Sequence, residues 1–175
     1  LKTDEFADLY AEELKAEGGV ISGEQFVDEC QVESDLELLL PATYVTGSSE
    51  RMLLYRELDS LTLDKDVEAF RNRLIDRFGP VPSETEELLR IVPLRRLAAR
   101  LGAEKVFLKG GRMSLFFISN PESPYYQSQA FGKVIAYMMK YTRRCDLREQ
   151  NTRRSMLVKD VKNVETAVGV LQEIV

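Results

Sequence analysis

The sequence predicts an α+β fold, with N-terminal helices followed by a small, mostly antiparallel sheet and helices packed against it. Two observations support this prediction. Apolar residues recur at helical spacing through residues 48–101, and short segments of alternating polarity, separated by turn residues, follow between 104 and 160. The chain has 175 residues, 44% of them hydrophobic, which is enough for the core of one domain.

The first 60 residues are expected to form two helices and one strand. Residues 4–17 have helix-forming composition and end at a pair of glycines, which indicates a helical tail separate from the domain core. Residues 31–40 carry leucines on one face and are closed by a proline, which is typical of a strand. A helix is then expected to open at Ser48 or Ser49.

The next helix is expected over residues 64–78. Its apolar residues step by three, four and four positions and form one ridge, made of Val67, Phe70, Leu74 and Phe78. Gly79 suits a left-handed cap, and Pro80 cannot extend the helix. At about 100° per residue, Asp76 points nearly opposite the ridge and Arg77 lies on its flank. Asp76 should therefore face outward.

A second long helix is predicted to follow and to end at Gly102. Ser83 and Glu86 have the spacing of a capping box, which would open this helix. Pro93 lies within the helical pattern and is expected to kink the helix or split it in two, because proline removes a hydrogen bond and clashes with the preceding turn.

The remaining residues are expected to form a hairpin, a helix, two strands and a final helix. The hairpin joins residues 104–109 and 112–118 across Gly110-Gly111. Its expected inward residues are Val106, Leu108, Leu115 and Phe117. The later elements are a helix over 125–141, strands over 144–149 and 155–160 joined by a turn containing Arg153-Arg154, and a helix over 163–174.

Composition argues against catalysis in this chain. Histidine is absent, which removes the commonest general base and the commonest transition-metal ligand. No phosphate-binding loop is present, and the Glu86-Glu87 pair is interpreted as solvated helix surface. Cys30 and Cys145 lack metal-ligand spacing and are expected to be reduced, buried thiols. We therefore expect no enzyme activity, no metal and no cofactor.

Charge is divided unevenly along the chain. Residues 1–70 carry a net charge of −13 and residues 71–175 a net charge of +8, within a total of −5. This division fits either docking within a larger assembly or opposed surfaces of one domain that neutralise each other. With no apolar run near the roughly 20 residues of a membrane span and no secretory signal, a cytoplasmic location is the expectation.

Residues 140–154 form the most basic stretch, which raises the alternative of a nucleic-acid-binding accessory domain. The cations of this stretch are Lys140, Arg143, Arg144, Arg148, Arg153 and Arg154. Asp146 and Glu149 interrupt it, and strand alternation sends its members to different faces. A structural or protein-contact surface is therefore preferred, and direct DNA binding is not expected.

Asp76 is the best clue to function. An ordinary explanation is an ion pair with Arg73 or a hydrogen bond with Asn72, either of which contributes only a few tenths of a kcal/mol. An acidic residue in the last turn of a helix also meets the negative end of the helix dipole, which is mildly unfavourable. A partner surface that supplies cations would offset that cost, so contact with a partner is the alternative.

Several short motifs together are characteristic of one known family. They are Leu36-Glu37-Leu38-Leu39-Leu40-Pro41, Tyr44, Arg51, Tyr55-x-x-Leu58, Leu74-x-Asp76-Arg77-Phe78-Gly79-x-x-Pro82 and Leu94-x-x-Leu97-Ala98-x-x-Leu101-Gly102. Through these motifs, residues 31–175 resemble the C-terminal domain of the bacterial transcription-repair coupling factor family. The match is strong over the first hundred residues and looser beyond the hairpin. The resemblance implies a helical tail of the preceding motor region over residues 1–22 and a C-terminal regulatory domain over 23–175.

The resemblance also implies a non-catalytic role. In this family the terminal domain packs on the UvrB-like N-terminal domain of the same polypeptide, masks the surface that binds UvrA, and restrains the DNA translocase until stalled RNA polymerase is engaged. Carried over by position, the interdomain contacts are Asp76 and Arg77. Arg73 stands where the family commonly has Glu, which implies a complementary change in the partner.

Overall fold

The computed structural model describes residues 26–175, which form one five-stranded sheet, five α-helices and a short 3₁₀ turn. The elements run in the order β1 Gln31–Ser34, α2 Ser48–Ser60, α3 Asp64–Phe78, α4 Ser83–Arg100, β2 Ala103–Lys109, β3 Arg112–Phe117, the 3₁₀ turn η2 Pro124–Gln127, α5 Gln129–Lys140, β4 Cys145–Gln150, β5 Arg153–Val158 and α6 Val164–Ile174. The tail expected over residues 1–22 lies outside the described residues.

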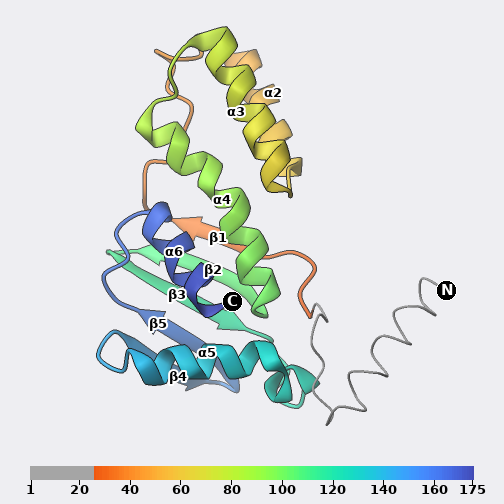
Figure 1. The fold of residues 1–175 in the computed structure, drawn as a ribbon, viewed down its shortest axis with the longest axis vertical. Coiled ribbons are helices and arrows are strands. Elements are labelled where there is room, and N and C mark those ends of the chain that lie inside the picture. Colours follow the sequence, from red (N-terminus) through yellow and green to blue (C-terminus); the bar gives the residue numbers. More distant parts are fainter. Residues whose placement is uncertain (1–25) are drawn as a thin grey trace, which may run out of the picture.

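The sheet has five strands in the spatial order β1-β2-β3-β5-β4. All pairs are antiparallel except β1 with β2, which is parallel. A parallel pair needs a long crossover, and α2, α3 and α4 supply it. The helices α4, α5 and α6 lie on one side of the sheet (Figure 1). The arrangement confirms the predicted α+β class.

Two apolar cores lie at opposite ends of α4. The larger joins the inward face of the sheet to α5, α6 and the C-terminal half of α4, where Leu94 and Leu97 are buried. The smaller joins α2, α3 and the N-terminal half of α4, through Leu89 and Val92. Because α4 belongs to both cores, it connects the α2–α3 hairpin to the sheet (Figure 1).

The strand predicted over residues 31–40 is shorter than expected. Pairing with β2 stops at Ser34, after which the chain leaves the sheet and crosses toward α2. The leucines that suggested a strand are divided between the cores: Leu36 and Leu38 pack against the larger one and Leu40 is buried in the smaller one. Alternating apolar positions here reflect two burial sites rather than one strand face.

The predicted capping box at the start of α4 is wrong. Pro82 is the N-cap residue, and its carbonyl oxygen accepts hydrogen bonds from the backbone N–H groups of Thr85 and Glu86. The Glu86 carboxylate instead accepts a bidentate hydrogen bond from Arg71 of α3, with Nη2–Oε2 at 2.7 Å. This ion pair fixes α4 against α3.

Three further expectations needed adjustment. The helix α4 is not split at Pro93 but runs continuously across it. The turn between β4 and β5 is formed by Asn151 and Thr152, both with positive φ, so the expected turn residues Arg153-Arg154 begin β5 instead. The start of the helix predicted over 125–141 is a separate 3₁₀ turn, Pro124–Gln127, and α5 begins after the Ser128 cap, whose hydroxyl accepts from a backbone N–H.

Several predictions are confirmed. The helix α3 has the predicted bounds, with Phe70 and Leu74 buried. The hairpin turns at Gly110-Gly111, both with positive φ, and its four expected inward residues are buried. Both cysteines are free thiols buried in the larger core.

A candidate interaction surface at the end of α3

The last turn of α3 is held in place from the loop that precedes α2. The Tyr44 hydroxyl donates to the carbonyl oxygen of Gly79 at 2.8 Å, and the Tyr44 ring contacts the Phe78 ring at 5.6 Å between centroids. Gly79 closes the helix with φ 92°, a conformation that favours glycine. The residues just before Gly79 are therefore presented from a fixed turn.

Two arginines of α3 connect it to α2. Arg77 pairs with Glu50 at 2.6 Å, and Arg73 forms an ion pair with Glu57. The side-chain hydrogen bond with Glu57 also raises the pKa of Arg73 above its usual value. All four side chains are at least partly exposed, so each pair contributes at most about 1 kcal/mol. Their main effect is to orient the arginines toward α2.

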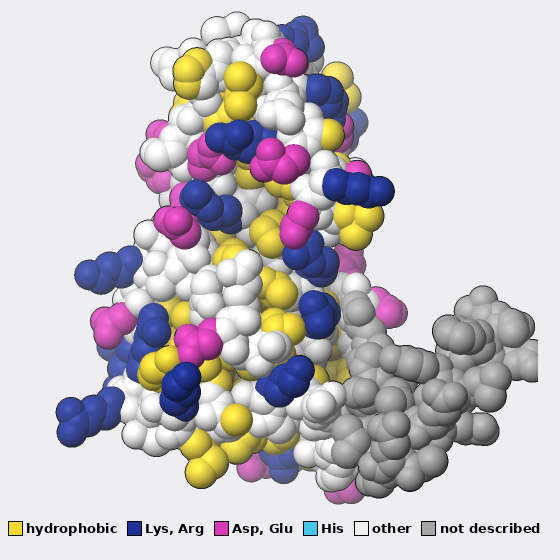
Figure 2. Space-filling view, in the orientation of Figure 1, with side chains coloured by type: hydrophobic (Ala, Val, Ile, Leu, Met, Phe, Trp, Pro, Cys, Tyr) yellow, Lys and Arg dark blue, Asp and Glu magenta, His cyan; other side chains and the backbone are white. Residues whose placement is uncertain are grey.

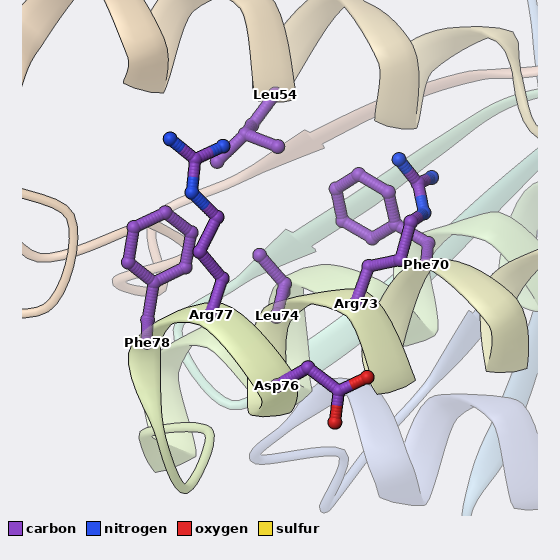
Figure 3. A pocket seen from close by; sticks show the side chains of 7 residues that line it. All are labelled: Leu54, Phe70, Arg73, Leu74, Asp76, Arg77 and Phe78. Carbon is purple, nitrogen blue, oxygen red and sulfur yellow. The ribbon is translucent and has the colours of Figure 1, made fainter.

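Asp76 is left without such a partner. Its side chain is exposed, and within residues 26–175 it forms no hydrogen bond or ion pair. Arg73 and Arg77 extend toward α2, whereas Asp76 projects from the other side of α3 (Figure 3). The ordinary explanation, an intrahelical contact with Arg73 or Asn72, is therefore wrong, because Arg73 is committed to α2. The outward orientation predicted from the helical angle is correct.

A groove of about 380 Å³ lies beside these three charges. Its apolar lining comes from Leu54 of α2 and from Phe70, Leu74 and Phe78 of α3 (Figure 3). Met52 and Leu53, which directly precede Leu54 in α2, are 57% and 62% exposed. The end of the hairpin thus offers apolar surface, two cations already paired, and one unpaired carboxylate.

Other polar residues of the family motifs in this region have partners within the domain. The Tyr55 hydroxyl accepts the backbone N–H of Leu40 at 2.7 Å, and Arg51 donates to the carbonyl oxygen of Val45 at 2.7 Å. These contacts, like that of Tyr44, brace the chain between β1 and α2. Among the charged residues of the Leu74–Gly79 segment, Asp76 alone has no partner within the part of the chain that the structure describes.

Sequence reasoning missed Glu50 and Glu57, which orient the two arginines. Their spacing of seven residues places both on one face of α2. That spacing was a usable signal, but only an antiparallel helix hairpin converts it into contacts with α3. Two further ion pairs, Arg95 with Asp59 and Arg96 with Asp64, also join the acidic first part of the chain to the basic second part.

Part of the charge division is thus neutralised among the described residues. Figure 2 shows lysine and arginine side chains interspersed with acidic ones over the α2–α3–α4 region, not gathered by sign. Mutual neutralisation within one domain therefore accounts for some of the uneven charge, and docking within a larger assembly stays a prediction.

The basic 140–154 stretch does not form one surface. Lys140 pairs with Glu173, and Arg144 donates to the carbonyl oxygens of Lys159 and Asp160. Arg154 stacks over the Tyr126 ring at 4.4 Å. Arg153 lies over the Phe116 ring and its neighbour Arg154 over the Tyr126 ring, so strand alternation sends these two to different faces, as predicted.

Residues 26–175 contain no group of three or more His, Cys, Asp or Glu side chains placed to hold a metal ion. None of the helices in this range is both long and apolar enough to cross a bilayer.

The sequence model of the TRCF domain family matches residues 34–128, more than half of the chain. The chain belongs to the TRCF domain family. The matched residues include β1's end, the α2–α3 hairpin, α4 and the β2–β3 hairpin, and so contain Arg73, Asp76 and Arg77. A TRCF domain is a region of the coupling factor that is not itself catalytic.

Curated relatives agree with this assignment. The chain is 29% identical over 150 residues to the transcription-repair-coupling factor of Rickettsia bellii, covering 82% of the chain and 13% of that protein. It is 26% identical over 149 residues to that of Rickettsia typhi, covering 83% and 13%. The chain thus spans about an eighth of the length of these relatives. These relatives are named as factors that couple transcription and repair.

A solved structure shares the fold. The crystal structure of the C-terminal domain of a transcription-repair coupling factor matches with a TM-score of 0.61 at 18% identity, covering 83% of this chain and 94% of that one. The two chains therefore share a fold over most of their length.

Proposed function

We propose that this TRCF domain is an autoinhibitory clamp. In this proposal it packs on the UvrB-like N-terminal domain of the same polypeptide, masks the surface that binds UvrA, and restrains the DNA translocase until stalled RNA polymerase is engaged. The observation that carries the proposal is the exposed, unpartnered Asp76 beside an apolar groove, within the segment that the family model matches.

The energetics favour a contact that combines charge with apolar burial. An exposed ion pair contributes about 0.2–1 kcal/mol, whereas a switch from 1:99 to 99:1 needs about 5.5 kcal/mol of differential binding. Asp76 and Arg77 cannot supply that alone. Leu54 in the groove and the exposed Met52 and Leu53 supply the apolar surface from which the remainder would come.

Arg73 and Arg77 have a secondary role in this proposal. Both are committed to α2, so their intradomain pairs would have to persist or exchange when the partner docks. Asp76 requires no such exchange, because it has no pair to break. It is therefore the sharper position to test.

The direct test measures binding of this chain to the separately expressed UvrB-like domain. The variant Asp76→Lys should weaken binding about fivefold or more, because it replaces an attraction with a repulsion. Glu122→Lys makes the same charge change at an exposed loop residue and serves as the matched control. Equal binding by wild type and Asp76→Lys, or equal weakening in both variants, would count against the assignment.

A second test uses the intact coupling factor. Release of the clamp by Asp76→Lys should raise both UvrA binding and ATP hydrolysis in the absence of polymerase. Unchanged values for both would refute the clamp.

A further inference from the structure

The face of the sheet that is turned away from the helices carries a distinct set of side chains. Strand register places Phe107 opposite Ser114, Ser114 opposite Leu157, and Leu157 opposite Asp146. These residues alternate with the buried residues of the larger core and do not belong to that core. Within residues 26–175, no helix covers this outer face (Figure 1).

Two aromatic rings lie next to each other on this face. Phe107 of β2 and Phe116 of β3 meet edge to face with centroids 5.3 Å apart, and both remain partly exposed. Neither packs against the larger core. In RNA-recognition domains, aromatic rings on the open face of a sheet stack unpaired bases.

Cations surround the two rings. The ammonium groups of Lys105 and Lys109 lie 5.4 and 5.1 Å from the centroid of Phe107. The guanidinium of Arg153 lies 5.7 Å from the centroid of Phe116. These cations lie over the rings, so a base that stacks on either ring would displace one of them, and the displaced cation would remain within reach of the phosphate of that base.

A hollow of about 440 Å³ lies on the same face beside Phe116. It is lined by hydroxyl, amide and guanidinium groups, including those of Ser114, Ser155, Gln150 and Arg148. These groups can donate or accept hydrogen bonds to a base edge or a phosphate. The hollow extends the aromatic pair toward β4, so the face offers stacking and polar contacts side by side.

The face carries charges of both signs. Its basic residues are Lys105, Lys109, Arg112, Arg148 and Arg153, and its acidic residues are Glu33, Glu104 and Asp146. Three more acids border it: the Asp35 carboxylate accepts the backbone N–H of Gly110, and Asp28 and Glu29 line a hollow with Lys105 and Arg153. Glu104 pairs with Arg153 at 3.0 Å and Asp146 with Arg148 at 3.8 Å. Lys105, Lys109 and Arg112 form no ion pair within the described residues and are available to phosphates.

We propose that this outer sheet face binds single-stranded DNA. Stacking on Phe107 and Phe116 would hold two bases, and the three unpaired cations would contact the backbone. A DNA strand suits a domain whose relatives are named for coupling transcription to repair. The proposal is independent of the clamp, because the face lies on the sheet and Asp76 lies on the α2–α3 hairpin.

The test is fluorescence anisotropy with a labelled 12-nucleotide oligothymidine and this chain. Neutralising about three phosphates gives a salt slope near −2, so binding should weaken about 20-fold between 50 and 200 mM salt. Lys109→Glu with Arg112→Glu should make the slope shallower by about 1.4. Phe107→Leu with Phe116→Leu keeps apolar volume but removes the rings, and should weaken binding at least about fivefold.

The matched control is Lys65→Glu with Lys133→Glu, which makes the same charge change at exposed residues of α3 and α5 away from this face and should alter binding less than twofold. Circular dichroism verifies that each variant is folded. If the leucine variant unfolds, the comparison of Lys109→Glu with Arg112→Glu against the control still decides the test. Absence of binding at 50 mM salt would overturn the proposal, as would an equal loss in the control. Tighter binding of duplex DNA, an RNA oligonucleotide or a poly-glutamate peptide would also overturn it, each by assigning the face to another ligand.

Discussion

The carboxylate of Glu87 joins α4 to the start of α6 and permits a quantitative test of the packing between them. Its two oxygens accept backbone N–H groups from Val164 at 2.6 Å and Glu165 at 3.1 Å. These N–H groups belong to the first turn of α6, where no intrahelical acceptor exists and where the helix dipole favours negative charge. Glu87 therefore acts as a remote cap, and its interpretation as solvated surface is wrong.

Replacement of Glu87 by alanine should lower the free energy of unfolding by about 2 kcal/mol. A hydrogen bond to a charged group is worth about 1.5–3 kcal/mol, and water replaces part of that at this partly exposed helix end. Loss of the ion pair with Arg90 at 2.9 Å adds less than about 1 kcal/mol. With a urea m-value near 2 kcal/mol/M, the midpoint should fall by about 1 M at unchanged m.

Glu87→Gln keeps one acceptor oxygen and should fall between wild type and alanine. Glu68→Ala removes an exposed carboxylate from α3 and should change stability by less than about 0.5 kcal/mol. If Glu87→Ala unfolds at the same urea concentration as Glu68→Ala, the capping role is refuted. A changed m-value would point instead to a change in the unfolded state or to loss of two-state behaviour.

Two further predictions concern Gly102 and Cys30. Gly102→Ala should destabilise the fold by about 3 kcal/mol, because φ is +86° and the new Cβ would overlap the Tyr125 ring, with Cδ1 2.8 Å away. As a control, Gly132→Ala in α5, where the new Cβ meets open space, should stabilise the fold by about 0.5–1 kcal/mol. Equal shifts of the melting temperature in the two variants would contradict this contrast. Burial raises the pKa of the Cys30 thiol from 9.0 to about 12. Between these pH values the thiol ionises in the unfolded chain but not in the folded one. Its contribution to stability is therefore complete below pH 9 and is lost as pH rises toward 12. Urea unfolding between pH 8 and 11 should show this loss in wild type and less of it in Cys30→Val, and identical pH profiles would contradict the assignment.

Local signals predicted the elements well where one helix or turn determines the outcome. The ridge of α3 and the glycine turn between β2 and β3 depend on spacing within a few residues, and both are confirmed. The outward direction of Asp76 followed from the same helical spacing. These features hold because their physical cause is contained within the segment itself.

Features that depend on a distant partner were missed or misassigned. Glu86 had the spacing of a capping box, but Arg71 of α3 offers it a bidentate ion pair instead. The leucines after Ser34 were interpreted as one strand, although two different cores bury them. In each case the local pattern was real, but a tertiary contact that the pattern does not contain gave the larger stabilisation.

The sequence by itself determined the α+β class, the helix that ends at Gly79 and the exposure of Asp76, because periodicity and turn chemistry act over one or two turns of chain. Only the tertiary structure decided which charges are free. It paired Arg73 and Arg77 with α2 and left Asp76 without a partner within residues 26–175. It also placed β5 beside β3, which brings Arg153 to the Phe116 ring on the open sheet face, because strand order joins residues that lie far apart along the chain.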